Sequence, residues 1–197
     1  MSDVITLSNL LKQNAKLVTN KCIFEQVTEA DSNFIYELRS NHRASFLRNS
    51  GGNASDQKEY LLNYKLSFEN GDEIYYKVRN RQNSKIEAVV RLTELKNLPI
   101  FNWESFISVE GSDPTTPIEI MLTIYKIGFE IFGCEQCGPW DVDKEHLSMQ
   151  RIHTIVGMAN PIAESDSYFK YAVFKSDYET KISKFNRMGF AQLVGVN

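Results

Sequence analysis

Apolar residues recur every second position in some segments of the chain and every three to four positions in others. The first spacing is typical of half-buried strands and the second of amphipathic helices. In the first expected helix, for instance, the residues roughly on one side would be Val4, Leu7, Leu11 and Val18. Strands are predicted at 22–27, 73–79, 85–95, 101–109, 138–142, 168–174 and after residue 188, and helices at 4–18, 28–40, 55–68, 116–132, 144–156 and 176–188.

Residues at the expected helix starts support these boundaries. Thr28 and Asp31, and later Ser176 and Glu179, have the spacing of a capping box. Ser55 is placed to cap the second long helix. Helices and strands in this order predict an α/β (α+β) fold with a mixed central sheet and helices on both faces.

Length and composition fit one globular domain, with 197 residues of which 42% are hydrophobic and 24% charged. Residues 1–20 are expected to form an N-terminal extension and 21–197 the domain. The net charge of −3 gives no electrostatic reason to expect nucleic acid. The apolar runs are shorter than the roughly 20 residues of a membrane helix. The start does not resemble a secretory signal, and with three cysteines the expected location is cytoplasmic.

Cys134 and Cys137 form a C-x-x-C pair, which raises the question of a metal site. A structural zinc site needs four ligands, and the nearest other candidates are His146 and His153. On one helix these two would be separated by about 10.5 Å along the axis and could not share one zinc. We therefore expect no metal, and two small residues in a strand or loop.

The stretch "VEGSDPTTPIEIML" (109–122) predicts a strand, a turn and a helix. Thr116 can be the N-cap and Pro117 the first helical residue, while Glu119 can reach back to the Thr116 amide. Helix starts of this kind also attract anions. Because Pro117 has no N–H and Glu119 is itself an anion, the residues alone favour a plain capped helix over a phosphate site.

The order of elements and two motifs resemble the GNAT superfamily of acyl-CoA-dependent N-acyltransferases. In that family the helix after the pyrophosphate loop ends near an "aFe.lG" pattern, and this chain reads "IGFEIFG" (127–133). Counting back from Phe129 puts Ser112, Thr115 and Pro117 on the loop's three signature positions. The family has Arg or Gln, Gly, and Gly or Ala there, so all three depart from its pattern.

The family's second motif is similar to "VDKEHLSMQRIHTIVGM" (142–158). His146, Met149 and His153 replace the family's asparagine, small residue and tyrosine. The early "ELR…FLRNS…QKEYLLNY" region and the late "FKSDYETKISKFNRMGF" resemble bacterial enzymes that acylate amino sugars on nucleotide carriers.

The resemblance implies a GNAT-like, mostly antiparallel sheet from about residue 21 onward, with acyl-CoA as co-substrate. The sheet would splay beside the strand at 101–109, and the pantetheine arm would lie against the freed backbone. The coenzyme contacts implied by the resemblance are Ser108, Val109, Glu110, Ser112, Thr115, Thr116 and His146.

His153 takes the position of the family's general-acid tyrosine. A histidine with a pKa near 6.5 is a reasonable acid for a departing thiolate, and the alternative is a histidine that only stabilises a helix C-terminus. Glu104 and Asp141 are the candidate bases, and each is otherwise an ordinary strand carboxylate.

The acceptor is expected between the early helices and the sheet. Arg39, Arg43 and Arg48 could hold a diphosphate, and Trp103 could stack on a base or sugar. The alternative is a set of solvated arginines and a core tryptophan.

The predicted function is transfer of an acetyl or larger acyl group from acyl-CoA to the amine of a nucleotide-linked amino sugar, a precursor of cell-surface polysaccharide or O-antigen. The alternatives are a protein N-terminal or small-amine acetyltransferase and a non-catalytic acyl-CoA-binding domain. Neither a nucleic acid nor a membrane partner is expected, and the chain could act as a homodimer.

Overall fold

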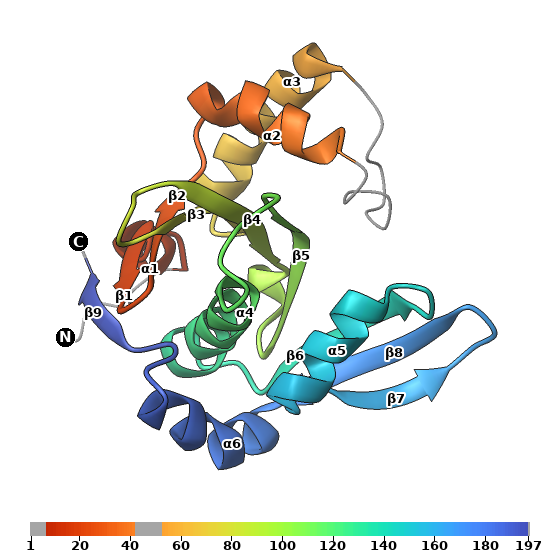
Figure 1. Ribbon diagram of the computed structural model, residues 1–197. Helices are drawn as coiled ribbons and strands as arrows, with labels where there is room; N and C mark the ends of the chain where they lie inside the picture. Colours follow the sequence, from red (N-terminus) through yellow and green to blue (C-terminus); the bar gives the residue numbers. More distant parts are fainter. Residues whose placement is uncertain (1–6, 42–52, 197) are drawn as a thin grey trace.

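The computed structural model describes residues 7–41 and 53–196, which form one nine-stranded sheet with helices on both faces (Figure 1). The strand order is β7-β8-β6-β5-β4-β3-β2-β1-β9. Within the described chain, β5 and β6 are the one parallel pair. The predicted mixed, mostly antiparallel fold is therefore confirmed.

The elements have the following bounds. The strands are β1 (Lys16–Thr19), β2 (Cys22–Gln26), β3 (Ile74–Asn80), β4 (Ile86–Thr93), β5 (Ile100–Ser108), β6 (Gln136–Asp143), β7 (Asn160–Glu164), β8 (Tyr168–Phe174) and β9 (Leu193–Val196). The helices are α1 (Leu7–Gln13), α2 (Ser32–Arg39), α3 (Ala54–Glu69), α4 (Thr116–Lys126), which continues into the π-helical turn η4 (Ile127–Ile131), α5 (Leu147–Val156) and α6 (Lys175–Arg187). None of the helices in the described ranges is long and apolar enough to cross a membrane.

Strand β4 shows which helices cover which face of the sheet, because successive strand residues point to opposite faces. Val90 lines a small cavity together with Ile120 and Ile124 of α4. The next residue, Arg91, donates a hydrogen bond to the Tyr60 hydroxyl of α3. Helix α4 therefore covers one face and α3 the other.

The helix expected at 4–18 is wrong after Gln13, where α1 ends and β1 soon begins. Val18 pairs with Ile23 of β2, and β9 pairs with the other edge of β1. Sheet pairing on both edges outweighs the helical spacing of the apolar residues. Leu11 and Leu17 are fully buried, so this segment shares one core with the rest of the chain.

One of the predicted helix caps is confirmed, and another is replaced by a neighbouring residue. The Thr28 amide donates to Asp31 Oδ2 at 2.8 Å, which confirms that capping box. Helix α3 is capped by Asn53 and not by Ser55, because the Asn53 side-chain oxygen accepts from the amides of Ser55 and Asp56.

The C-terminal third of the chain differs from the sequence prediction in two places. Helix α6 follows β8 directly with Phe174 as N-cap, so the box expected from Ser176 and Glu179 does not form. Phe174 is still paired with Gln136 of β6 where the helix begins. Strand β7 was not predicted because its short "NPIAE" contains proline, which is tolerated in the edge strand that β7 is.

Gly128 lets the turn η4 lie against β5. A Cβ at this position would lie 2.1 Å from the Phe101 ring. That ring is fully buried and packs edge-on against Phe129, with 5.2 Å between ring centroids. Because Phe101 is paired with β6, this contact lies at the point where β5 and β6 meet.

We expect Gly128→Ala to lower the free energy of unfolding by about 1–3 kcal/mol, because the added methyl must displace the Phe101 ring. Urea unfolding measures the change. The control is Gly195→Ala, since a Cβ there meets nothing within 4 Å, and its effect should stay within about 0.5 kcal/mol. Equal losses in the two variants would contradict the packing argument.

Candidate active site

Strands β5 and β6 stay together for only two residue pairs, Ile100 with Gln136 and Phe101 with Cys137. After Phe101, β5 continues to pair with β4 on its other edge, and β6 continues beside β8. The two facing edges diverge from each other, and we call the opening between them the split. Backbone groups on these edges are left outside the parallel ladder.

The direction of β6 changes immediately after the paired residues. The register of β6 against β8 shifts between Cys137 and Trp140. Gly138 adopts a left-handed φ of 88° in that interval, and Pro139 has no N–H to donate. This local irregularity bends β6 away from β5 and produces the split.

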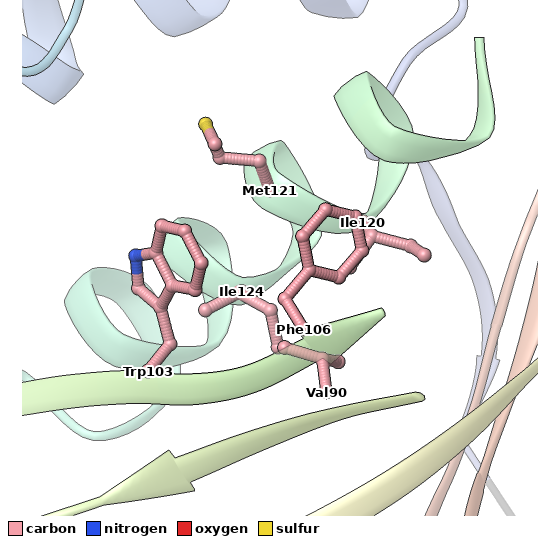
Figure 2. A pocket seen from close by; sticks show the side chains of 6 residues that line it. All are labelled: Val90, Trp103, Phe106, Ile120, Met121 and Ile124. Carbon is pink, nitrogen blue, oxygen red and sulfur yellow. The ribbon is translucent and has the colours of Figure 1, made fainter. Parts of the chain in front are cut away.

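A β-bulge in β5 determines which side chains face α4. The register against β4 shifts in the middle of β5, where Ser105 has φ 54°. Trp103 and Phe106, three positions apart, consequently lie on the same side of the strand. They line a cavity of about 10 Å³, room for about one water molecule. Figure 2 shows its lining residues, which are Val90, Trp103, Phe106, Ile120, Met121 and Ile124.

Four ring side chains meet where the two strands separate. Trp103 of β5 and Trp140 of β6 lie with ring centroids 5.5 Å apart. His153 of α5 contacts both, at 6.3 and 5.6 Å, and stacks on Tyr171 of β8 at 4.7 Å. The indole N–H of Trp140 donates to Nε2 of His153 at 3.4 Å.

The surroundings of His153 make it a weaker base than the sequence analysis assumed. Its side chain is 2% exposed. Burial, together with the charge of His146, lowers the pKa of His153 from 6.5 to about 4. The ring is therefore neutral at pH 7, and little imidazolium is present to protonate a thiolate. The assumed pKa near 6.5 is corrected accordingly.

In the loop before α4, a carboxylate of the loop itself accepts the hydrogen bonds that could otherwise go to a bound anion. Asp113 Oδ1 accepts from the amide of Thr115 at 2.7 Å and from its hydroxyl at 2.8 Å. These bonds lower the pKa of Asp113. The Thr116 amide donates to the Asp113 carbonyl at 2.9 Å, and Pro117 has no amide hydrogen. The amides of Thr115 and Thr116, two residues expected at the pyrophosphate, are therefore engaged within the loop.

Two buried carboxylates hold the start of α4, and neither caps it in the expected way. Thr115, not Thr116, is the N-cap, and the Thr116 hydroxyl donates to Glu87 of β4. Glu119 is fully buried and accepts from the Ala191 amide at 3.0 Å, so it does not reach back to Thr116. The expected competition of Glu119 with a phosphate is therefore wrong, and Asp113 takes that place.

Lys21 is a cation at this loop that the sequence analysis missed. Its ammonium lies 3.4 Å from the Thr115 hydroxyl and 3.8 Å from the centroid of the Phe190 ring. Lys21 comes from the turn between β1 and β2, 94 residues before Thr115. Sequence spacing carries no signal for a contact of this kind.

The three residues expected to hold the pantetheine arm follow the edge of β5. The Val109 amide donates to the Glu87 carbonyl at 2.7 Å, so it is used within the sheet. Because backbone groups alternate between strand edges, those of Ser108 point to the opposite side, toward the split, whereas Glu110 lies in the turn that follows the strand. The Ser112 amide turns back to the Val109 carbonyl at 3.3 Å.

Glu104 lies on the face opposite Trp103. Its carboxylate pairs with Arg91 at 2.5 Å. Arg91 also pairs with Glu73 at 3.2 Å, and burial raises the pKa of Glu73. Asp141, the second candidate base, is exposed and lies 3.8 Å from Lys170 in a cross-strand pair.

The remaining predicted residues are placed as follows. Arg39 lies in the last turn of α2, and its charge acts on the buried hydroxyl of Tyr75. Arg43 and Arg48 lie outside the described residues. His146 precedes α5, where its amide donates to the Asp143 carbonyl at 3.0 Å, and burial lowers the pKa of its ring.

Several solved structures that match this fold are described as acyltransferases. Neither a family model nor a curated protein matches the sequence. A structure described as apo FdhC, a nucleotide-linked sugar GNAT, matches with 29% identity and a TM-score of 0.77, over 88% of this chain and 98% of that one. Spermidine N-acetyltransferase from Vibrio cholerae, solved with CoA and spermine, matches with 13% identity and a TM-score of 0.65, over 80% of this chain and 98% of that one. A GCN5-related N-acetyltransferase from Brucella melitensis matches with 10% identity and a TM-score of 0.67, over 87% of this chain and 84% of that one. The last two show a shared fold alone.

The chain has the fold of the GNAT acyltransferases and is 29% identical to one of them. The predicted recognition, fold class and enzyme class, an acyl-CoA-dependent N-acyltransferase, are confirmed. In this chain the split borders β5, and β5 leads through residues 109–115 to the start of α4. They form one continuous candidate site.

The C-x-x-C pair lies inside the core of this GNAT-type fold. Cys134 and Cys137 are fully buried. Burial raises the pKa of both thiols, that of Cys134 to about 11. Among the residues that the structure describes, no group of three or more His, Cys, Asp or Glu side chains is arranged to hold a metal ion.

The buried Glu119 gives a pH-dependent prediction. Burial raises its pKa above the ordinary 4.5, so folding favours the protonated form. Its contribution to stability is full at low pH and is lost as pH rises through the raised pKa. Glu119→Gln keeps an oxygen for the Ala191 amide and cannot ionise. We therefore expect the stability of this variant relative to the wild type to increase from about pH 4 to about pH 8.

Urea unfolding of both proteins across this pH range measures the difference in unfolding free energy. A difference that stays constant with pH, or that moves in favour of the wild type as pH rises, would contradict the assignment.

Proposed function

We propose that this GNAT-type chain transfers an acyl group from acyl-CoA to the amine of a nucleotide-linked amino sugar. The observation that carries the proposal is the 29% identity over 88% of the chain to a nucleotide-linked sugar GNAT. Spermidine acetyltransferases with the same fold match at only 12–13% identity. Identity at this level favours the sugar over a polyamine as acceptor.

The two substrates approach the split from opposite faces in this proposal. Trp103 faces α4, whereas its neighbour Glu104 faces the side of α3 through Arg91 and Tyr60. The coenzyme would follow the edge of β5 on the α4 side, and the acceptor amine would come from the α3 side. Both reacting groups then meet beside residues 103 and 104.

Glu104 is the better placed of the two candidate bases. Arg91 holds its carboxylate, and the side chain of Glu104 is 45% exposed, so an incoming amine can reach it. An amine with a pKa near 8 is partly neutral at pH 7, so a modest base suffices. Asp141 is paired with Lys170 on β6 and β8. Arg39, Arg43 and Arg48 remain the proposed diphosphate contacts.

The start of α4 is the proposed site for the pyrophosphate of the coenzyme. Lys21 and the hydroxyls of Thr115 and Ser112 are the groups that support anion binding there, in place of glycine amides. Asp113 opposes it, because its carboxylate occupies the positive end of the helix. Ligand binding at this loop must therefore overcome a fixed negative charge.

Asp113→Asn tests this location. The amide keeps an oxygen for Thr115 and removes the charge, so we expect coenzyme A to bind about two- to fivefold more tightly, which corresponds to about 0.3–1 kcal/mol. Isothermal titration calorimetry measures Kd. The control is Asp166→Asn, an equal charge change at an exposed turn between β7 and β8. Equal affinities in all three proteins would place the pyrophosphate elsewhere.

The acceptor is tested with a nucleotide-linked amino sugar, the free amino sugar, spermidine and a peptide amine at equal concentration, each with several acyl-CoAs. We expect the nucleotide-linked sugar to have the highest kcat/KM, because binding of the remote nucleotide helps to orient the reacting amine. Release of free thiol measures turnover. A better peptide or spermidine acceptor would replace the sugar assignment, and absence of thiol release with every amine would favour a binding domain.

A further inference from the structure

His153 has one ring nitrogen with a partner and one without. Nε2 accepts the hydrogen bond from the Trp140 indole. Nδ1 is buried and has no hydrogen-bond partner within the described structure. An indole nitrogen can only donate, so Nε2 must carry the lone pair, and the proton of the neutral ring is on Nδ1.

This arrangement is costly unless something completes it. A buried donor left without an acceptor gives up its hydrogen bond to water without replacement, and the great majority of buried polar groups in proteins have partners. The ring is held in place by its stack on Tyr171 and its contact with Trp140. An acceptor atom supplied by a ligand would remove the cost.

The position of the ring indicates which ligand supplies that acceptor. His153 contacts Trp103 on β5 and Trp140 on β6, the two strands that border the split. Figure 2 shows the Trp103 indole with its nitrogen directed away from Phe106. The ring of His153 therefore lies at the point where the strands separate and where the proposed function puts the thioester.

We propose that His153 Nδ1–H donates a hydrogen bond to the acyl carbonyl oxygen of the thioester, and that Trp140 is the positioning residue that holds His153 in this tautomer. The proposal rests on the proposed function for the identity of the ligand. The assignment of the tautomer rests on the contacts of His153 alone.

The reaction balances with His153 unchanged. The acceptor amine attacks the thioester carbon, the C–N bond forms, and the carbonyl oxygen gains negative charge that the Nδ1–H bond stabilises. The C–S bond then breaks, and the amine loses one proton while the thiolate gains one. The products are the amide and coenzyme A, and His153 has neither gained nor lost a proton.

A neutral donor agrees with the environment of the ring. Burial and the charge of His146 lower the pKa of His153 to about 4, so the ring is neutral at pH 7. The ring stacks on the aromatic ring of Tyr171. A preorganised donor needs no proton transfer to act, as in other oxyanion sites.

The tautomer is measured by NMR on protein with ¹⁵N-labelled histidine, from the two-bond couplings that distinguish Nδ1–H from Nε2–H. We expect Nδ1–H in the wild type and a mixture in Trp140→Phe, which keeps an aromatic ring and loses the indole donor. Tyr171→Phe keeps the stacked ring and is the matched control, with an unchanged tautomer. An Nε2–H wild type, or an unchanged tautomer in Trp140→Phe, would overturn the role of Trp140.

Contact with the carbonyl is measured in the same spectra with a ketone analogue of acyl-CoA, which keeps the carbonyl and cannot transfer it. We expect the Nδ1 proton signal to move downfield with the analogue and to stay in place with coenzyme A, which lacks that oxygen. The same shift with both ligands, or with neither, would overturn the contact.

Kinetics separates a donor from a structural residue. His153→Leu should lower kcat by about 10²–10³ with little change in KM, the usual loss on removing one oxyanion donor. His153→Asn keeps an N–H near the Nδ1 position and should retain more of kcat. Equal activity in the two variants, with melting temperatures like the wild type, would overturn the proposal. If the wild type acylates no amine, the proposed function and the carbonyl contact fail together, while the tautomer measurement still decides the role of Trp140.

Discussion

The candidate site depends on how briefly β5 and β6 remain paired. Two parallel residue pairs join them, and the irregularity at Gly138 and Pro139 then turns β6 away. The pairing is placed by Phe101, whose buried ring lies against Gly128 in the turn after α4. A longer ladder would satisfy more backbone groups but would close the edge of β5. The opening therefore follows from local backbone geometry on one side and from core packing on the other.

The bulge at Ser105 adds a second constraint, because it changes which side chains of β5 share a face. Trp103 and Phe106 both pack toward α4, while Glu104 reaches Arg91 on the other face. An unbroken strand would alternate strictly and could not put residues 103 and 106 together. The bulge thus gathers two aromatic rings on the α4 side, while ordinary strand alternation leaves Glu104 on the ionic α3 side.

The start of α4 illustrates how a loop without the usual glycines is held. The Asp113 carboxylate accepts hydrogen bonds from the amide and hydroxyl of Thr115, and the Thr116 hydroxyl donates to Glu87 on β4. Lys21 approaches from a distant turn and supplies the positive charge. These contacts hold the loop without any ligand, but part of its capacity to bind an anion is already used by Asp113.

Much of the fold was predictable from the sequence, because hydrophobic periodicity reports which faces of each segment are buried. The strands at 73–79 and 85–95, the capping box of Thr28, and the strand–turn–helix at 109–122 were all recovered in this way. The motifs around 127–133 and 142–158 predicted the superfamily. Tertiary structure decided the rest. Residues 16–19 were predicted as helix and form strand β1, because they pair with both β2 and β9. The contact of Lys21 with Thr115 joins residues 94 positions apart, and the pKa of His153 depends on burial among rings from three different elements. Sequence determines which residues are available, but the charge state and partners of a buried group depend on neighbours that only folding brings together.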